Sequence, residues 1–290
     1  MRVCVVGLGG VGGYIAANFF RAGIDVVGVA RGEHFKALKE DGLRIMEDEK
    51  TFTVALPVCE AGFLEGIFDV VLFCTKTYDL KDAAEVMQNH INKNTVAVSF
   101  SNGVANAEVL RSCLDAQILD GIVYILAHIE QPGVVRKNGN VFAAVFGGEK
   151  SDLFAKLFEK SNLKYKISLD IQKDLWKKYI FISAFATLTS YYDLSIYQIY
   201  RQKNEVVRTV LEEIAMVAKY KGIDIKKEVE KSLQTASKLP KDASTSMHKD
   251  FLNKKKTELE SLTGYLVHEA KESGIELPCI AKMYEELKKR

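Results

Sequence analysis

The feature that most constrains this chain is a cluster of glycines directly behind an apolar segment at its start. Residues 2–6 (Arg-Val-Cys-Val-Val) are rich in β-branched side chains, which suits a strand covered on both faces of a parallel sheet. The glycines follow in Gly7-Leu8-Gly9-Gly10-Val11-Gly12-Gly13, and residues 14–22 then read as a helix that Gly23 ends. Residues 25–30 predict a second strand, so the glycines occupy the strand-to-helix turn of a β-α-β unit.

This context predicts a dinucleotide-binding turn. Gly7 permits the tight turn, Gly9 lets the backbone approach a pyrophosphate, and Gly12 lets the helix pack closely on the strands. The helix N-terminus then offers unpaired N–H groups and the positive end of its dipole to the phosphates. We therefore predict that the cofactor contacts Gly7, Leu8, Gly9, Gly10, Val11 and Gly12. A glycine-rich turn that binds nothing is the alternative, and the complete flanking pattern disfavours it.

Arg31, at the end of the second predicted strand, points to the kind of dinucleotide. NAD-binding sites usually carry an acidic residue here, which bonds the 2′-hydroxyl of the ribose. An arginine suits a 2′-phosphate instead, through charge-assisted and often paired hydrogen bonds. The sequence thus favours NADP(H), although an ordinary solvated arginine before a surface helix would look the same.

Composition excludes several classes of partner. A formal net charge of +2 over 290 residues gives no reason to expect binding to nucleic acid or to an anionic membrane. No apolar stretch has the length of a membrane span, and a strand that begins at residue 2 leaves no room for a signal peptide. The 5 cysteines are scattered without metal-binding spacing, which predicts no metal site and favours the reducing cytoplasm.

Polar residues follow two further predicted strands of the first half. Lys76 comes just after the strand at 68–74, and Asn102 follows the strand at 95–100. Because ligands of open α/β sheets bind beyond the carboxyl ends of the strands, we expect both residues to share one crevice with Arg31 and the glycine turn. Two hairpins are also predicted, around Asp48-Glu49 and at Asn138-Gly139, the second being a strong turn signal.

The pattern changes near residue 170, where clusters of β-branched residues stop and helical periodicity begins. We predict an α/β fold, with a Rossmann-type dinucleotide-binding domain at 1–170 followed by an all-helical domain at 171–290. Residues 171–190 predict a central buried helix, because ten residues after Lys178 carry no charge. Lys178 lies at the edge of that helix, where partial desolvation lowers the pKa of an ammonium. Further helices are expected at 204–221, 226–238, 247–253 and 257–273.

The motifs, in this order and spacing, resemble the ketopantoate reductase (2-dehydropantoate 2-reductase) family over nearly the whole chain. In the first half they are the glycine turn, Arg31, Thr75-Lys76, Ser101-Asn102-Gly103 and Pro132-Gly133-Val134-Val135. In the second half they are Leu175-Trp176-Lys177-Lys178, Ser246-Met247-His248-Lys249-Asp250, Thr257-Glu258-Leu259-Glu260, Gly264-Tyr265-Leu266 and the tail from Ala270 to Pro278.

The resemblance implies NADPH-dependent reduction of a small 2-oxo acid, above all 2-dehydropantoate to pantoate in pantothenate and coenzyme A biosynthesis. Lys178 is then the general acid and Glu258 the active-site carboxylate that positions substrate and lysine. The resemblance also implies that Lys178, Glu258, Asn102 and Ser246 contact the substrate. It places Lys76 and Asn102 near the cofactor. The residues alone allow plainer roles: a lysine that reaches solvent, an exposed glutamate, and a serine that caps a helix.

Some positions depart from the family pattern. Asparagines that hold the substrate in the family correspond here to Ile182, Ala186 and Ile196, and a pocket built for hydrogen bonds loses most when alkyl groups replace the donors. A bulkier or more apolar 2-oxo acid is therefore one alternative substrate. A β-hydroxyacid or opine type of Rossmann dehydrogenase and a non-catalytic NADPH sensor are further alternatives. The helical domain also offers a face for a homodimer.

Overall fold

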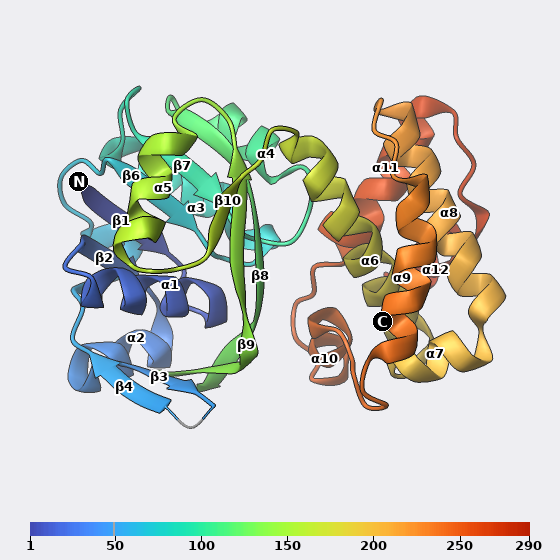
Figure 1. The fold of residues 1–290 in the computed structure, drawn as a ribbon, viewed down its shortest axis with the longest axis horizontal. Helices are drawn as coiled ribbons and strands as arrows, with labels where there is room; N and C mark the ends of the chain where they lie inside the picture. The colour runs from blue at the N-terminus through green and yellow to red at the C-terminus, as the bar shows by residue number, and fades with distance from the viewer. Residues whose placement is uncertain (49) are drawn as a thin grey trace. The chain divides into compact units, whose positions relative to one another are not determined.

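The computed structural model describes residues 1–48 and 50–290, and within them the chain divides into two compact units. The first unit holds Met1–Ser101 and Ala105–Ile171, and the second holds Asn102–Val104 and Gln172–Arg290. All the strands belong to the part of the chain coloured from blue to yellow-green in Figure 1, and the part from yellow to red is helical.

The first unit is built around one 10-stranded sheet of described residues. Its strands are β1 (Arg2–Val6), β2 (Asp25–Val29), β3 (Leu43–Glu47), β4 (Lys50–Val54), β5 (Val58–Cys59), β6 (Val70–Phe73), β7 (Val96–Ser99), β8 (Gln117–Gln131), β9 (Val134–Gly147) and β10 (Tyr165–Ile167). Its helices are α1 (Gly10–Arg21), α2 (Gly32–Asp41), α3 (Leu80–Met87), α4 (Asn106–Cys113) and α5 (Ser151–Lys160), with short 3₁₀ turns η1 (Ala61–Phe63), η2 (Thr77–Asp79) and η3 (Gln88–His90).

The sheet confirms the predicted Rossmann-type architecture. Its strand order is β4-β3-β9-β8-β7-β6-β1-β2-β5, with β10 beside β9. The run from β5 to β8 is parallel, whereas β9 is antiparallel to β8 and β4 is antiparallel to β3. Because β2, β1, β6 and β7 are adjacent and parallel, their carboxyl ends lie at one edge of the sheet, as the sequence predicted.

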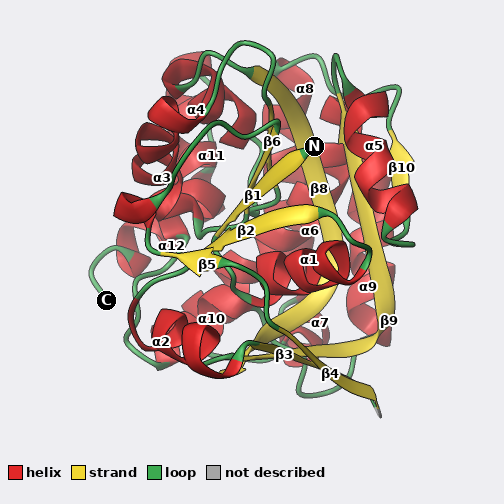
Figure 2. Cartoon of the chain, turned by 90° about the vertical axis from the view of Figure 1, so that its left-hand side faces the viewer, coloured by secondary structure: helices red, strands yellow, loops and turns green. Residues whose placement is uncertain are grey.

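Two apolar layers cover the sheet, and strand alternation assigns side chains to them. Val3 and Val5 of β1 belong to the cluster that includes α1 and α5 residues, whereas Cys4 and Val6 belong to the cluster that includes α3 and α4 residues. Successive side chains of a strand point to opposite faces, so both faces of this short apolar strand are buried. Figure 2 shows α1 and α5 on one side of the strands and α3 and α4 on the other.

The two predicted hairpins have different outcomes. Strands β3 and β4 pair antiparallel as expected around Asp48, while Glu49 lies outside the described residues. The hairpin predicted at Asn138-Gly139 is wrong, because β9 continues through these residues. The pairing with β8 shifts there, from Ala127 opposite Lys137 to Ile125 opposite Phe142. The additional residues of β9 form a bulge. Gly139 lies in this bulge with φ +66°, a backbone conformation that glycine adopts easily.

The second unit contains α6 (Ile171–Tyr192), α7 (Ile196–Gln202), α8 (Asn204–Tyr220), α9 (Lys226–Lys238), α10 (Ser246–Leu252), the π-helix η4 (Glu260–Gly264), α11 (Tyr265–Ser273) and α12 (Pro278–Leu287). Helix α6 is its buried centre, as predicted, with Ile180, Ala184, Phe185 and Leu188 fully buried. The single helix expected at 257–273 is instead η4 followed by α11, and α7 was not predicted. None of the described helices is both long and apolar enough to span a membrane.

Candidate active site

The glycine turn has the close packing that its sequence requires. Gly7 has φ +94°, and a Cβ there would lie 3.0 Å from the backbone of Cys74 and Thr75. A Cβ on Gly12 would lie 2.1 Å from the Gly7 carbonyl oxygen, which leaves no room for any side chain. Gly9 is different, since nothing lies within 4 Å of its Cβ position. The turn is therefore packed on its inner side and open at Gly9, the geometry that admits a pyrophosphate.

The N-terminus of α1 is suited to an anion. The helix begins at Gly10, earlier than the predicted start at residue 14, so Gly10 to Gly13 form its first turn. Its N-cap, Gly9, provides no side-chain cap, and the first turn carries no acidic residue. The free N–H groups and the dipole of this twelve-residue helix can thus act on a bound phosphate. These residues fit a nicotinamide dinucleotide.

Arg31 and the segment after β6 meet at the same edge of the sheet. The Arg31 guanidinium donates to the Asp79 carboxylate at 2.7 Å, and 82% of the Arg31 side chain is exposed. Lys76 lies three residues before Asp79 and accepts the Asp79 N–H at its backbone carbonyl. Beside Lys76, the hydroxyl of Thr75 is buried with no hydrogen-bond partner among the described residues. A bound polar ligand at this edge would supply that partner.

In the second unit, the structure brings Lys178 and Asn102 together. The Lys178 ammonium donates to the Asn102 side-chain carbonyl at 3.1 Å, although 76 residues separate the two in sequence. Lys178 lies in the second turn of α6, and Asn102 belongs to the short segment Asn102–Val104 that groups with the helical unit. Two of the four predicted substrate contacts are thus in direct contact with each other.

The pKa of Lys178 is lowered to about 8, as the sequence predicted, because burial penalises the charged ammonium. The negative charge of Glu258 partly opposes this effect and raises the pKa. Glu258 itself is only 3% exposed, so it is not the solvated acid that its surroundings in the sequence allowed. A buried carboxylate therefore acts electrostatically on a lysine that can both hold and release a proton near neutral pH.

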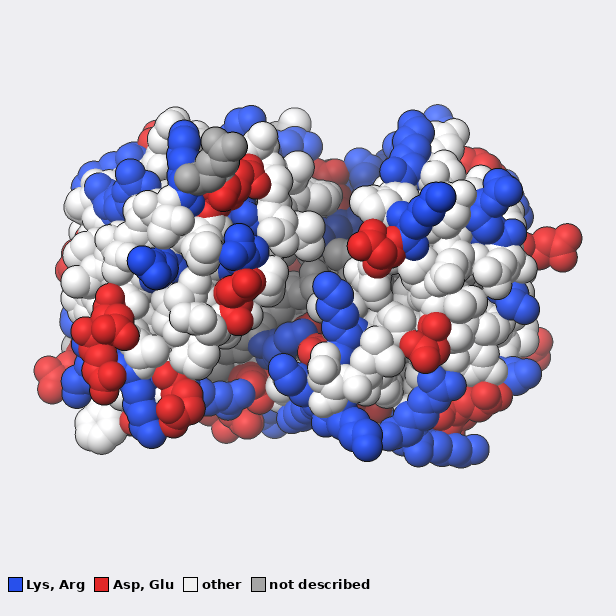
Figure 3. Space-filling view, turned by 90° about the horizontal axis from the view of Figure 1, so that it is seen from below, with Lys and Arg blue, Asp and Glu red and all other residues white. Residues whose placement is uncertain are grey.

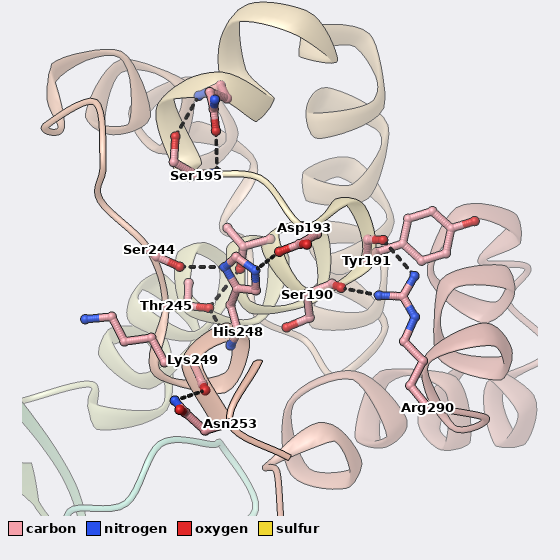
Figure 4. A network of polar contacts seen from close by, with 12 residues as sticks. Ser190, Tyr191, Asp193, Ser195, Ser244, Thr245, His248, Lys249, Asn253 and Arg290 are labelled. Carbon is pink, nitrogen blue, oxygen red and sulfur yellow. Dashed lines mark hydrogen bonds and ion pairs between the residues drawn. The ribbon is translucent and has the colours of Figure 1, made fainter. Parts of the chain in front are cut away.

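Ser246 is the first residue of α10 and is exposed, and the cap of that helix is its neighbour. The Thr245 hydroxyl accepts the N–H of His248 at 3.2 Å, so helix capping, the alternative role for Ser246, belongs to Thr245. The ring of buried His248 bonds the Ser244 hydroxyl at 2.7 Å and the Asp193 carboxylate at 2.8 Å (Figure 4). These contacts join the start of α10 to the end of α6.

Buried hydroxyl groups join α6 to the segment that follows Glu258. The Thr187 hydroxyl donates to the Ser183 carbonyl at 2.8 Å, so it accepts the hydrogen of the Thr263 hydroxyl at 2.7 Å. The Tyr179 hydroxyl donates to the Leu262 carbonyl at 2.6 Å. Both contacts hold the π-helix η4, which begins at Glu260, two residues after Glu258. The helix that carries Lys178 therefore also positions Glu258.

Comparison with known proteins identifies the family of this chain. The family model "Ketopantoate reductase PanE/ApbA" matches residues 3–148, and the model of its C-terminal domain matches residues 170–290. The chain belongs to the ketopantoate reductase family. This is a family of oxidoreductases, and the assignment covers both units.

Curated relatives of the ketopantoate reductase family match over almost their full length. An uncharacterized oxidoreductase, YkpB of Bacillus subtilis, is 29% identical over 99% of this chain and 98% of its own. A 2-dehydropantoate 2-reductase of Halobacterium salinarum is 27% identical over 97% of this chain and 95% of its own.

Solved structures show the same fold. A ketopantoate reductase from Ralstonia eutropha superposes with a TM-score of 0.92 at 27% identity, covering 99% of this chain and 97% of its own. A D-mandelate dehydrogenase with NADH and anilino(oxo)acetate superposes with a TM-score of 0.91 at 20% identity, covering 100% and 98%, and this likeness concerns the fold alone.

Two of the three positions that depart from the ketopantoate reductase pattern lie on the same helix as Lys178. Ile182 and Ala186 follow Lys178 at intervals of four residues along α6, so the three share one face of the helix. Ile196 begins α7 and is 4% exposed. Ile182 is partly buried, whereas Ala186 is 1% exposed, so of these alkyl groups only that of Ile182 is open beside the lysine. On the face drawn in Figure 3, lysines and arginines are interspersed with acidic residues.

Sequence reasoning did not find Asp79, Thr245 and Thr263, which contact predicted site residues or the elements that carry them. Asp79 could have been noticed as the acid that starts the helix after Lys76. Thr245 is a preferred capping residue, but Ser246 beside it is an equally good candidate, and nothing in the local sequence marks the hydroxyl pair of Thr263.

Proposed function

We propose that the protein reduces a small 2-oxo acid to the 2-hydroxy acid with NADPH, and that the substrate is 2-dehydropantoate, reduced to pantoate in pantothenate and coenzyme A biosynthesis. The observation that carries this proposal is the contact of Lys178 with Asn102, together with the buried charge of Glu258. Membership of the ketopantoate reductase family and the named 2-dehydropantoate 2-reductases among the relatives support the choice of substrate.

In this proposal residues 1–170 form the domain that binds the cofactor. Gly7, Gly9 and Gly12 admit the pyrophosphate at the N-terminus of α1, and Leu8, Gly10 and Val11 complete the turn. Arg31 selects NADP(H), because its exposed guanidinium can leave Asp79 and pair with a 2′-phosphate. Lys76 contributes to cofactor binding from the same edge of the sheet.

Residues 171–290 form the catalytic domain, to which Asn102 contributes. When bound, the nicotinamide supplies a hydride to the carbonyl carbon of the substrate. As negative charge develops on the carbonyl oxygen, the Lys178 ammonium stabilises it and then donates its proton to that oxygen. Asn102 fixes the direction of one of the three N–H bonds of the ammonium. Glu258 keeps a useful fraction of Lys178 protonated, and Ser246 binds the substrate.

A second candidate substrate is a more apolar 2-oxo acid. Ile182 and Ala186 extend the face of α6 beyond Lys178 with alkyl groups that cannot bond a hydroxyl or carboxylate. A non-catalytic NADPH sensor and a β-hydroxyacid or opine type of dehydrogenase are less favoured, because Lys178, Asn102 and Glu258 are held as one group.

The test is NADPH oxidation by the purified chain with 2-dehydropantoate and with a panel of straight, branched and aromatic 2-oxo acids. We expect turnover that Lys178→Ala lowers by about 10²- to 10⁴-fold, as for loss of a general acid. Lys177→Ala is the matched control, since Lys177 is the neighbour on the same helix and pairs with Asp174 at 3.0 Å.

The outcomes separate the candidates. Activity on 2-dehydropantoate that depends on Lys178 supports the first substrate, and a higher kcat/KM for an apolar 2-oxo acid supports the second. Binding of NADPH without turnover of any acid contradicts both and favours the sensor. Faster turnover with NADH than with NADPH contradicts the role of Arg31.

Compartment and partners stay predictions. We place the protein in the cytoplasm, because its five cysteines are all unpaired and Cys4 is buried as a small apolar side chain. A small-molecule substrate is the expected partner, with neither nucleic acid nor a membrane, and a homodimer would form through the helical unit.

A further inference from the structure

His34 connects three separate segments of the first unit. It lies in the first turn of α2 and is half-buried. Its Nε2 lies 2.9 Å from the carbonyl oxygen of Leu8, in the glycine turn. Its Nδ1 lies 3.1 Å from the backbone nitrogen of Gly133, in the turn between β8 and β9.

The partners of the ring define its protonation state. The Gly133 N–H can only donate, so Nδ1 accepts with its lone pair and carries no hydrogen. The Leu8 carbonyl can only accept, so Nε2 carries the hydrogen and donates it. The ring is therefore neutral in this arrangement. Burial lowers the pKa of His34 below its ordinary value, while the Leu8 carbonyl raises it by a smaller amount.

The bond to Leu8 determines where the next peptide N–H points. In a trans peptide the carbonyl of Leu8 and the N–H of Gly9 point in opposite directions. A carbonyl directed at His34 therefore directs the Gly9 N–H away from His34, and this N–H bonds to none of the described residues. The Leu8 side chain is also fixed, since it fills the space where Gly28 would carry a Cβ, with its Cδ1 2.4 Å from that position.

We propose that neutral His34 is a positioning residue for dinucleotide binding, which holds the Leu8–Gly9 peptide so that the Gly9 N–H faces the phosphate. Protonation of Nδ1 would turn an acceptor into a donor that opposes the Gly133 N–H and would release this arrangement. Affinity for the dinucleotide should thus fall in acid. This inference rests on the proposed function for the cofactor, but not on the substrate or on catalysis.

The charged side chains closest to His34 in the sequence of α2 form ion pairs. On α2 the neighbours Glu33 and Lys36 form an ion pair at 2.8 Å, and Arg31 at the start of the helix pairs with Asp79. The glycine turn and Gly133 bond to the ring through backbone groups. Within the described residues, no charged side chain contributes to the shifted pKa of His34.

The experiment titrates the purified full chain with NADPH and measures the Kd by fluorescence for two variants. His34→Leu removes both hydrogen bonds at similar volume, and we expect its Kd to rise about tenfold. His34→Gln keeps one acceptor and one donor without a charge, and its Kd should stay within about threefold of the parent. Lys36→Gln, an exposed change on the same helix, is the control and should leave the Kd unchanged.

The same titrations, repeated between about pH 5 and pH 8, give the pH dependence of the Kd. A purely structural role of His34 would not change this dependence. The 2′-phosphate of NADPH also titrates in this range, and His34→Gln reports that contribution alone. We expect the Kd of the parent to rise more steeply in acid than that of His34→Gln. Equal slopes, or a Gln variant that binds as weakly as the Leu variant, would overturn the inference.

The result also separates this inference from the proposed function. A parent that binds neither NADPH nor NADH contradicts both. If His34→Leu binds NADPH as tightly as the unsubstituted chain, only the role of His34 is contradicted. Binding that depends on His34 without any turnover supports the inference and contradicts only the proposed reduction.

Discussion

The Lys178 ammonium donates a hydrogen bond to the Asn102 side-chain carbonyl at 3.1 Å. A neutral amide can orient the ammonium without adding charge. The acidity of Lys178 therefore depends on two other influences, burial, which lowers its pKa to about 8, and the charge of Glu258, which raises it. Adding or removing one charge beside the ammonium tests how far its pKa can be moved.

The first prediction concerns pH and Asn102. Since the protonated lysine is the active form for reduction, kcat/KM should fall as the pH rises above about 8. Asn102→Asp places a negative charge beside the ammonium. The falling limb of the pH profile of kcat/KM should therefore move to higher pH, by about one pH unit or more. Rates measured from pH 6 to 10 test this, and a limb that stays in place in the variant would show that the contact is not made in the working enzyme.

The second prediction concerns Glu258. Glu258→Gln removes the charge that raises the pKa of Lys178 and leaves the effect of burial, so the same limb should move to lower pH. Glu258→Asp retains the charge and should leave the limb nearer its original position. A loss of activity in Glu258→Gln with an unmoved limb would mean that the carboxylate acts on substrate rather than on the lysine.

The third prediction concerns Arg31 and Asp79. Arg31→Ala should raise the KM for NADPH about tenfold and change the KM for NADH little, because only NADPH has the 2′-phosphate. Asp79→Asn releases Arg31 from an exposed ion pair, so the KM for NADPH should fall by up to about fivefold. Equal effects of Arg31→Ala on both dinucleotides would exclude the phosphate as its partner.

The fourth prediction concerns stability. Thr187→Val leaves the hydroxyl of Thr263 buried without its partner, and should lower the free energy of unfolding by about 1–3 kcal/mol. The double variant with Thr263→Val should lose less than the sum of the two single changes, because the second removes the unpaired group. Urea denaturation measures all three, with the exposed Thr235→Val as control. Strict additivity would contradict a direct hydroxyl pair.

Sequence reasoning succeeded where one local pattern admits a single structure. The short apolar run before Gly7 is typical of a strand buried on both faces. Gly7 and Gly12 behind it lie so close to neighbouring backbone that a side chain would clash there. The long uncharged stretch after Lys178 likewise had to be a buried helix, which in turn predicted the lowered pKa of that lysine.

It failed where two local solutions cost similar free energy. Asn138-Gly139 suits a hairpin turn, but the continuing pairing of β8 with β9 makes it a bulge. Thr245 and Ser246 are both good capping residues, and the contact of Thr245 with Thr189 at 2.8 Å favours the first. No residue pattern distinguishes the π-helix before α11 from an ordinary α-helix, and contacts with α6 hold it.

The sequence by itself determined the order of elements, the glycine turn, the family, and the side chains able to carry the chemistry, because these depend on spacing along the chain. Only the tertiary structure decided that Asn102 meets Lys178, that Arg31 is paired with Asp79, and that His34 holds the glycine turn. Such contacts join residues far apart in the chain, and whether they form depends on the burial and packing of whole elements, which no local window of sequence contains.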